Sequence, residues 1–387
     1  MRLQLIASTL LLCAAACAAF AQTGTPATAK ESFSPPERKF EFTYSFTLKD
    51  LPAGTKLVRI WIPVPPSDKH QSATMSRTDA PVGSKLGKDP EYGNQIRYFE
   101  IPNPGAGEYK FTVVYKVTRR EYSSGDFATL ERKDAPPGVV PASMTRFVEP
   151  DKLIPTDGVI QELAQKVTGN DKGTVAKAHA AYEYLFTTMK YDKTGTGWGR
   201  GDAVWACDAK HGNCTDFHSP CIGMLRADKS PAKFEIGFPL PEGKDQGDIP
   251  GYHCWAEFYS GNIGWIPVDI SEAWKAKQKE TYFFGSIDAN RVQFSTGRDI
   301  TLVPKQDGPP LNYFVYPYVE VDGKPYDKIE KHFSFVESRA PAKKQAALPT
   351  PATGSYASER KARRRIASMQ SSPSAAVDGR PREVFHP

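Results

Sequence analysis

Long apolar runs are scarce in this chain of 387 residues. After the first 21 residues, no stretch approaches the roughly 20 apolar residues that a membrane-spanning helix needs, which excludes a protein with several membrane helices. The N-terminus is the exception: Arg2 precedes a short apolar segment that ends in Ala19-Phe20-Ala21, the small-x-small form of a cleavage site. We therefore expect residues 1–21 to be a secretory signal peptide and the protein to be periplasmic or secreted.

Cysteine is also scarce, and two of the six cysteines lie in that N-terminal segment. A lipid anchor on Cys17 is an alternative to simple cleavage, although the preceding alanines are a poor context for it. The other four are spaced by seven, seven and thirty-three positions, so the chain has no CxxC pair. This spacing is not that of the usual structural zinc sites, and we expect no metal or other cofactor. The four are Cys207, Cys214, Cys221 and Cys254.

Signals for nucleotides and nucleic acids are missing as well. The glycine-rich segment 195–201 lacks the Lys-Ser/Thr pair of a phosphate-binding loop. The net charge of +6 arises in the tail, where ten Lys/Arg stand against three Asp/Glu from Ser338 onward. The rest of the chain has no basic surplus, so we expect no nucleic-acid partner. Ala, Ser and Pro dominate residues 337–387, which predicts a disordered basic tail suited to weak contact with an anionic surface such as lipid or cell-wall polymer.

Alternating hydrophobic residues follow a Thr/Ala/Pro-rich linker at 22–37. Residues 40–46, with the sequence FEFTYSF, alternate strictly, which predicts a half-buried strand. Further strand patterns lie at 57–65, 95–101 and 109–117. Together they predict an antiparallel β-sandwich-like domain over 38–125, which we interpret as a packing or substrate-positioning module.

Helical periodicity appears after a Pro-rich connection at 126–154. Apolar residues recur there at intervals of three and four, which predicts two amphipathic helices. Their buried faces comprise Ile160, Leu163, Ala164 and Val167, then Ala178, Ala181, Tyr182 and Leu185. Strand patterns thus precede the helical region, and further strand patterns follow it. This order predicts the α+β fold class.

The segment GNCTDFH has the form of a helix start. Asn213 is a favourable N-cap, and Asp216 three residues later completes a capping box. Cys214 then lies at the positive end of the helix dipole, which favours the thiolate, the nucleophilic form of cysteine. The alternative is a buried structural cysteine, the commonest fate of this residue type. Pro220 lies inside the expected helix and removes one backbone hydrogen bond.

Two strand patterns, 251–259 and 263–269, flank a Ser-Gly-Asn turn. Three-residue loops with glycine are common in hairpins. With Gly261 at the centre, His253 faces Asp269, and directly opposed residues share one face with Cβ atoms about 5 Å apart. The hairpin therefore predicts a carboxylate beside an imidazole.

Cys214, His253 and Asp269 together predict an acyl-transfer triad. In such a triad the histidine activates the nucleophile and the acid orients the histidine. His218, one helical turn after Cys214, is an alternative base, but the sequence shows no evident carboxylate partner for it.

The same motifs resemble the transglutaminase-like superfamily, relatives of papain-like cysteine enzymes. The matching stretches are GNCTDFH, GYHCWAEFY and GWIPVDIS. The resemblance implies a transglutaminase-like (papain-like) catalytic domain at 155–336. In it, a helix bearing the nucleophile Cys214 packs on an antiparallel sheet bearing the base His253 and the orienting acid Asp269, and residues 276–336 extend that sheet.

Cys254 departs from the family pattern, which usually has alanine beside the histidine. A disulfide from Cys254 to Cys207 or to Cys221 is conceivable on the sequence alone.

The implied reaction is attack on an amide or peptide carbonyl to give a thioester acyl-enzyme. We favour hydrolysis, by a peptidase or amidase acting on protein or peptide substrates of the envelope. Acyl transfer from glutamine to an amine, which cross-links proteins, uses the same residues. A non-catalytic envelope module that binds peptide or glycan is the third reading.

Overall fold

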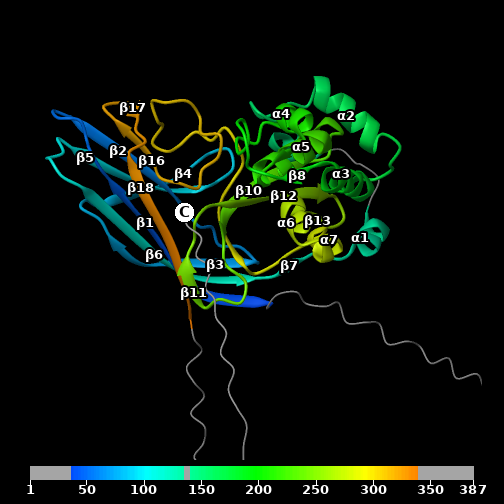
Figure 1. Ribbon diagram of the computed structural model, residues 1–387, viewed down its shortest axis with the longest axis horizontal. Coiled ribbons are helices and arrows are strands. Elements are labelled where there is room, and N and C mark those ends of the chain that lie inside the picture. The colour runs from blue at the N-terminus through cyan, green and yellow to red at the C-terminus, as the bar shows by residue number, and fades with distance from the viewer. Residues whose placement is uncertain (1–35, 135–139, 339–387) are drawn as a thin grey trace, which may run out of the picture. The chain divides into compact units, whose positions relative to one another are not determined.

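The computed structural model describes residues 36–134 and 140–338. The expected signal peptide, the expected basic tail from 339 onward and nearly all of the expected linker lie outside these ranges. Within them, no helix is long and apolar enough to cross a bilayer. The described chain has an α+β fold with antiparallel sheets, as expected (Figure 1).

Two five-stranded antiparallel sheets form the sandwich. The first has the order β11 (Gln246–Asp248), β18 (Ile329–Glu337), β1 (Glu37–Leu48), β6 (Tyr109–Arg120) and β3 (Gln71–Asp79). The second has the order β17 (Lys324–Pro325), β16 (Tyr318–Val321), β2 (Leu57–Val64), β5 (Gln95–Pro102) and β4 (Ser84–Lys88). The strict alternation in β1 places Phe40, Phe42, Tyr44 and Phe46 in the core.

The end of the described chain belongs to this sandwich. We expected residues 276–336 to extend the catalytic sheet, and this is wrong for β16, β17 and β18. Figure 1 shows these orange strands among the blue and cyan ones. Phe42 on β1 lies opposite Phe335 on β18, so the last strand buries its apolar face against the first. Local periodicity predicts a strand but does not name its partner, which is why the sequence misassigned these strands.

The second part contains a four-stranded antiparallel sheet covered by helices. Its order is β13 (Gly264–Val268), β12 (His253–Ser260), β10 (Ala232–Pro239) and β15 (Arg291–Thr296). The helices are α2 (Gly158–Thr168), α3 (Thr174–Thr188), α4 (Ala203–Ala209), α5 (Cys214–Ala227), α6 (Ile270–Lys275) and α7 (Glu280–Phe283). Helix α5 is central: it packs on β10 and β12 on one side and on α2, α3 and α4 on the other. All of its residues except Ala227 are buried.

Several short elements were not expected from the sequence. The Pro-rich connection contains α1 (Phe127–Lys133) and the 3-10 helix η1 (Ala142–Val148). The remaining elements are β7 (Tyr122–Ser123), β8 (Lys190–Tyr191), β9 (His211–Gly212), β14 (Ser286–Ile287) and the 3-10 helix η2 (Lys277–Lys279).

The sandwich and the second part share one apolar core. The ring of Phe42 lies 5.2 Å from Phe238 on β10 and 5.3 Å from Phe294 on β15. Arg38 on β1 adds polar contacts, since its guanidinium donates to Asn290 Oδ1 at 3.0 Å and to the carbonyl of Lys244 at 2.9 Å. The sandwich therefore packs directly against the four-stranded sheet.

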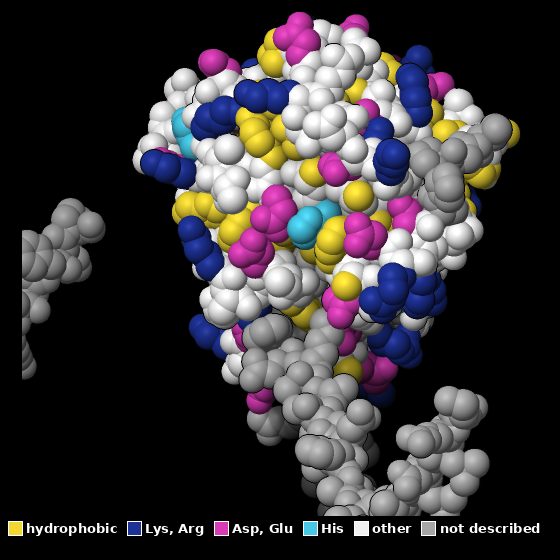
Figure 2. All heavy atoms as spheres, turned by 90° about the vertical axis from the view of Figure 1, so that its right-hand side faces the viewer, with side chains coloured by type: hydrophobic (Ala, Val, Ile, Leu, Met, Phe, Trp, Pro, Cys, Tyr) yellow, Lys and Arg dark blue, Asp and Glu magenta, His cyan; other side chains and the backbone are white. Residues whose placement is uncertain are grey.

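Figure 2 shows the face on the helical side of the molecule. Acidic and basic side chains are interspersed on that face, so the described part of it presents no surface of a single charge.

Candidate active site

Cys214 is the first residue of α5, as the sequence predicts, and the predicted capping box is present. Asn213 Oδ1 accepts from the backbone N–H of Thr215 at 2.9 Å, and Asp216 Oδ2 accepts from the N–H of Asn213 at 2.9 Å. These contacts satisfy donors that every helix start leaves open. The result is a fixed helix start with the thiol on its first turn.

The glycine-rich loop 195–201 is fastened to this helix start. Asp216 accepts hydrogen bonds from the backbone N–H groups of Gly199 at 2.7 Å and Gly201 at 3.0 Å. Gly201 has φ +61°, and a Cβ there would lie 2.7 Å from Ser219 Oγ. Only glycine fits this close approach, so the loop positions the helix that carries Cys214.

His253 and Asp269 are in contact: His253 Nε2 lies 2.7 Å from Asp269 Oδ2, and both side chains are buried. The predicted register of the hairpin is nevertheless wrong. A turn centred on Gly261 would pair Tyr259 with Ile263. The structure pairs Tyr259 with Trp265, so the turn is centred on Asn262 and the strand partner is shifted by two residues. A shift of one residue would have separated the two faces, whereas a shift of two keeps them on the same face.

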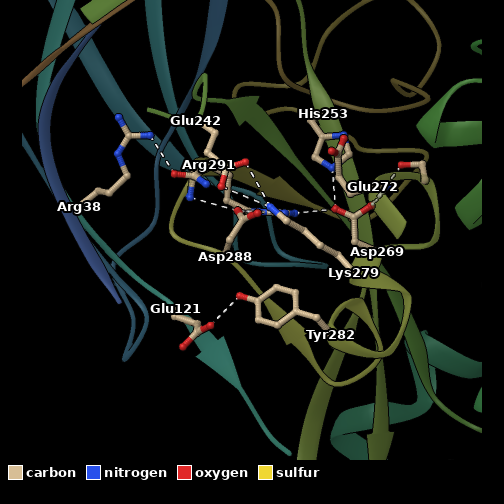
Figure 3. A network of polar contacts seen from close by, with 12 residues as sticks. Arg38, Glu121, Glu242, His253, Asp269, Glu272, Lys279, Tyr282, Asp288 and Arg291 are labelled. Carbon is tan, nitrogen blue, oxygen red and sulfur yellow. Dashed lines mark hydrogen bonds and ion pairs between the residues drawn. The ribbon is translucent and has the colours of Figure 1, made fainter. Parts of the chain in front are cut away.

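Asp269 therefore reaches His253 from just beyond the end of β13. It is the N-cap of α6, and its Oδ1 accepts from the backbone N–H of Glu272 at 3.0 Å and from Ser271 Oγ at 3.1 Å. Its Oδ2 also accepts from Arg291 Nη1 at 2.8 Å (Figure 3). Burial would raise the pKa of Asp269, but the charges of His253 and Arg291 hold it well below its usual value.

His253 is held as a cation by the same carboxylate. Burial alone would lower the pKa of His253, but the charge and hydrogen bond of Asp269, together with a hydrogen bond to Cys214, raise it to about 10. Because Nε2 contacts Asp269, Nδ1 is the nitrogen left to act on the thiol. Glu272 Oε1 also lies 3.8 Å from Nδ1.

Cys214 is 2% exposed. Burial would raise the pKa of its thiol, but hydrogen bonds from Cys254 and His253, and the positive charge of His253, hold the pKa well below its ordinary value. The tertiary contact that spacing alone does not prove, between Cys214 and His253, is therefore present in the fold. These pKa shifts favour a thiolate beside an imidazolium.

His218 is placed differently from His253. Its Nδ1 donates to the carbonyl of Cys214 at 2.7 Å, and its Nε2 accepts from the backbone N–H of Ile270 at 3.1 Å. Both nitrogens are used, and burial lowers the pKa of His218. The sequence shows no evident carboxylate partner for His218, yet Asp269 Oδ1 lies 3.7 Å from its Nε2. The neutral ring thus ties the nucleophile helix to the start of α6.

All four cysteines of the described chain are free thiols, so neither conceivable disulfide is formed. Cys254 is buried beside the nucleophile, and its Sγ lies 3.7 Å from His218 Nδ1. Burial and the neighbouring Cys214 thiolate raise the pKa of Cys254 well above its usual value. Burial likewise raises the pKa of Cys207 to about 11 and that of Cys221 to about 12. Cys214 alone among the four is poised as a thiolate.

A cavity of about 370 Å³ borders His253. Carboxylates of Glu242, Glu272 and Asp288 line it, together with Lys279 and Arg291 (Figure 3). It is wide enough for a side chain or a short peptide segment beside the imidazole. Among the described residues, no group of three or more His, Cys, Asp or Glu side chains is arranged to hold a metal ion.

Arg291 is the residue of this site that the sequence did not predict. It lies on β15, donates to both Asp269 and Asp288, and its guanidinium lies 5.0 Å from the ring centre of Trp255. A buried arginine on a strand has no local signature. The nearby Asp-x-x-Arg spacing, which pairs Asp288 with Arg291, is the one signal that the sequence offers.

Part of the chain resembles a known family in sequence. Residues 161–270 match the Transglutaminase-like superfamily. An uncharacterized protein of Haemophilus influenzae is 25% identical over 332 residues, which are 76% of this chain and 89% of that protein.

Two solved structures match this chain to different degrees. A candidate cysteine protease from Cytophaga hutchinsonii has a TM-score of 0.50 and 16% identity, over 78% of this chain and 99% of that one. The periplasmic domain of TgpA from Pseudomonas aeruginosa has a TM-score of 0.32 and 14% identity, over 64% of this chain and 91% of that one. The family match identifies a transglutaminase-like domain, and it covers Cys214, His253 and Asp269.

Proposed function

We propose that the transglutaminase-like domain of this chain, which spans residues 161–270, is a cysteine hydrolase that cleaves amide or peptide bonds. The observation that carries the proposal is the position of His253, between the Asp269 carboxylate at 2.7 Å and the Cys214 thiol. Peptides or proteins of the periplasm or the cell exterior are the proposed substrates, in line with the signal peptide expected at the N-terminus.

The first half of the reaction forms a thioester. The Cys214 thiolate attacks the carbonyl carbon, and the carbonyl π electrons move to oxygen. The backbone N–H of Cys214, at the helix N-terminus, is the donor nearest to that oxyanion. When the tetrahedral intermediate collapses, the C–N bond breaks and His253 Nδ1 gives its proton to the leaving amine.

The second half releases the acid. His253, now neutral, takes a proton from water, and the hydroxide attacks the thioester carbon. The C–S bond breaks and the thiolate of Cys214 returns, with the imidazolium restored beside it. Asp269 stays ionised throughout and keeps Nε2 oriented, so that Nδ1 faces the reacting atoms.

The test is alkylation of the reduced protein, without residues 1–21, by iodoacetamide from pH 4 to 9, with each cysteine followed by mass spectrometry. We expect Cys214 to react fast below pH 7, and the His253→Ala variant to lose this advantage. His332→Ala is the matched control, because His332 also pairs with an aspartate, Asp248 at 2.9 Å, but on the exposed surface of the sandwich. An ordinary pH profile for Cys214 in the unmodified protein would refute the catalytic role and leave a binding module.

Acyl transfer to an amine is the alternative outcome for the same thioester. A glutamine peptide incubated with a fluorescent primary amine distinguishes the two reactions. Ammonia release without incorporation of the amine into the peptide supports hydrolysis. Incorporation of one amine for each ammonia released makes the protein a cross-linking enzyme.

A further inference from the structure

Arg119 on β6 is a buried cation that forms no ion pair with any described residue, although the charges of Asp68 and Glu257 act on it. Its side chain is 1% exposed, and its Nε has no hydrogen-bond partner among the described residues. The contact that its guanidinium makes is with the ring of Trp255, whose centre lies 6.0 Å away. Two equally buried arginines, Arg226 and Arg291, each donate to a carboxylate, at 2.7 Å and 2.8 Å. Asp68 and Glu257 offset part of the cost of burying this charge, and the guanidinium donors remain available to an anion from outside the chain.

A cavity of about 280 Å³ provides the space for that partner. It lies where the edge of the sandwich meets the catalytic sheet, and Arg119 lines it together with Tyr122 and Trp265. The rings of Tyr122 and Trp265 form part of the wall, with His70 stacked on Tyr122 at 3.7 Å and Lys233 lying 4.7 Å from the centre of Trp265. The guanidinium supplies parallel N–H donors that match a carboxylate or a phosphate.

The charges around the cavity favour a single negative charge. Lys233, another lining residue, is already paired with Glu235 at 2.7 Å and Glu257 at 3.1 Å. Asp68 and Lys69 also line the cavity, so the lining holds three cations against two carboxylates, a balance that suits one added negative charge better than two. Burial and the charge of Arg291 lower the pKa of Arg119 to about 10, which still leaves it charged at neutral pH.

We propose that this cavity binds a small organic carboxylate, which pairs with Arg119 and packs its apolar part against Tyr122 and Trp265. The site is separate from the cavity beside His253. A chain of contacts connects the two cavities. The ring of Trp255 contacts both Arg119 and Arg291, and Arg291 donates a hydrogen bond to Asp269.

Isothermal titration calorimetry tests the proposal on the reduced protein without residues 1–21, with benzoate, acetate and inorganic phosphate at constant ionic strength. We expect saturable binding of benzoate, weaker binding of acetate, and the weakest binding of phosphate. Arg119→Met should abolish binding, and Arg119→Lys, which keeps the charge but loses the paired donors, should weaken it by about tenfold or more.

Arg97→Met is the matched control. Arg97 on β5 is also buried and also has an Nε without a hydrogen-bond partner among the described residues, but it does not line the cavity and it donates to Ser84 at 2.6 Å. The Arg97→Met variant should bind benzoate with the same affinity as the unmodified protein. If Arg119→Met does not fold, Arg119→Lys decides. No binding, equal binding by the Arg119 variants, or tighter binding of phosphate overturns the proposal.

Discussion

The interior between the sheets of the sandwich and the contact between α5 and β12 differ in the side chains that they bury. Between the sheets of the sandwich, aromatic rings pack on one another, as Phe46 does on Phe111 with ring centres 4.6 Å apart. Between α5 and β12, the buried groups include Asp269, His218 and His253. Apolar burial stabilises a fold in any arrangement that fills space, whereas buried charges are tolerated only with partners in place. The sandwich is therefore the stabilising half, and the polar interior is the half where geometry serves chemistry.

The largest effect is expected from a substitution that removes a buried charge of the polar half and leaves no cavity. Asp269→Asn keeps the size of the side chain but removes the charge that orients and protonates His253. We expect peptide cleavage to fall by about 10⁴-fold, as loss of the acid does in other triads. Steady-state kinetics measures this. Asp248→Asn, at the exposed pair with His332, should leave the rate unchanged.

The aromatic half is tested by Phe111→Ala. Phe111 is 1% exposed, stacks on Phe46 and meets Phe99 edge to face. Truncation leaves a cavity, so we expect the free energy of unfolding to fall by about 3–5 kcal/mol. Urea unfolding measures this loss, and the alkylation rate of Cys214 in the folded protein should not change. Val336→Ala, 53% exposed on β18, should stay within about 0.5 kcal/mol. A changed alkylation profile in Phe111→Ala would contradict the division between the halves.

Arg291→Met tests whether the polar half depends on its pairing. The substitution leaves Asp269 with fewer donors, so we expect a loss of about 2–3 kcal/mol at neutral pH. The pKa of Asp269 is lowered in the folded state, so its stabilisation is present above the unfolded pKa of about 3.9 and is lost as pH falls through the folded value. Without Arg291 that folded value rises, and acid unfolding should begin at a higher pH.

The dependence of stability on pH above neutrality provides the control for the Arg291→Met variant. His253 has a pKa raised to about 10, so its stabilisation is complete below the unfolded pKa of about 6.5 and is lost as pH rises through about 10. Asp269, not Arg291, causes this shift. Unfolding curves of Arg291→Met should therefore keep the alkaline limb of the unmodified protein, and a shift of that limb would contradict the assignment.

The smallest expected effect sharpens the comparison at the helix start. Asn213→Ala removes the cap of α5, which costs about 1–2 kcal/mol, a loss that thermal unfolding measures. His253 stays in place, so the alkylation rate of Cys214 at pH 5.5 should fall by less than tenfold. A larger fall would mean that the cap, more than the imidazolium, sets the thiolate.

Local signals in the sequence were reliable where the structure is local. The N-cap at Asn213, the helix start at Cys214 and the alternation in β1 depend on a few neighbouring residues, and each is confirmed. The contact between His253 and Asp269 was predicted for a partly wrong reason. The turn is centred on Asn262, and the contact is retained because the error was an even number of residues.

Long-range features were beyond the sequence. β18 pairs with β1, and Arg291 lies beside Asp269. The sequence patterns of these segments do not indicate which distant segment each one contacts. His218 shows the same limit at a finer scale. Its spacing from Cys214 was visible, but its partners, the carbonyl of Cys214 and the N–H of Ile270, depend on how α6 packs on α5.

The pairing of the first and last strands also constrains how the protein is made. Arg38 and Glu337, 299 positions apart, are joined by a hydrogen bond of 3.2 Å. A newly synthesised chain therefore has β1 paired with β6 but not with β18 until residues 329–337 have emerged, and contacts this distant form slowly. During that time the edge of β1, with its row of aromatic residues, is open to strands of other chains. A chain that stops before β18 would keep every residue of the triad and would be expected to aggregate.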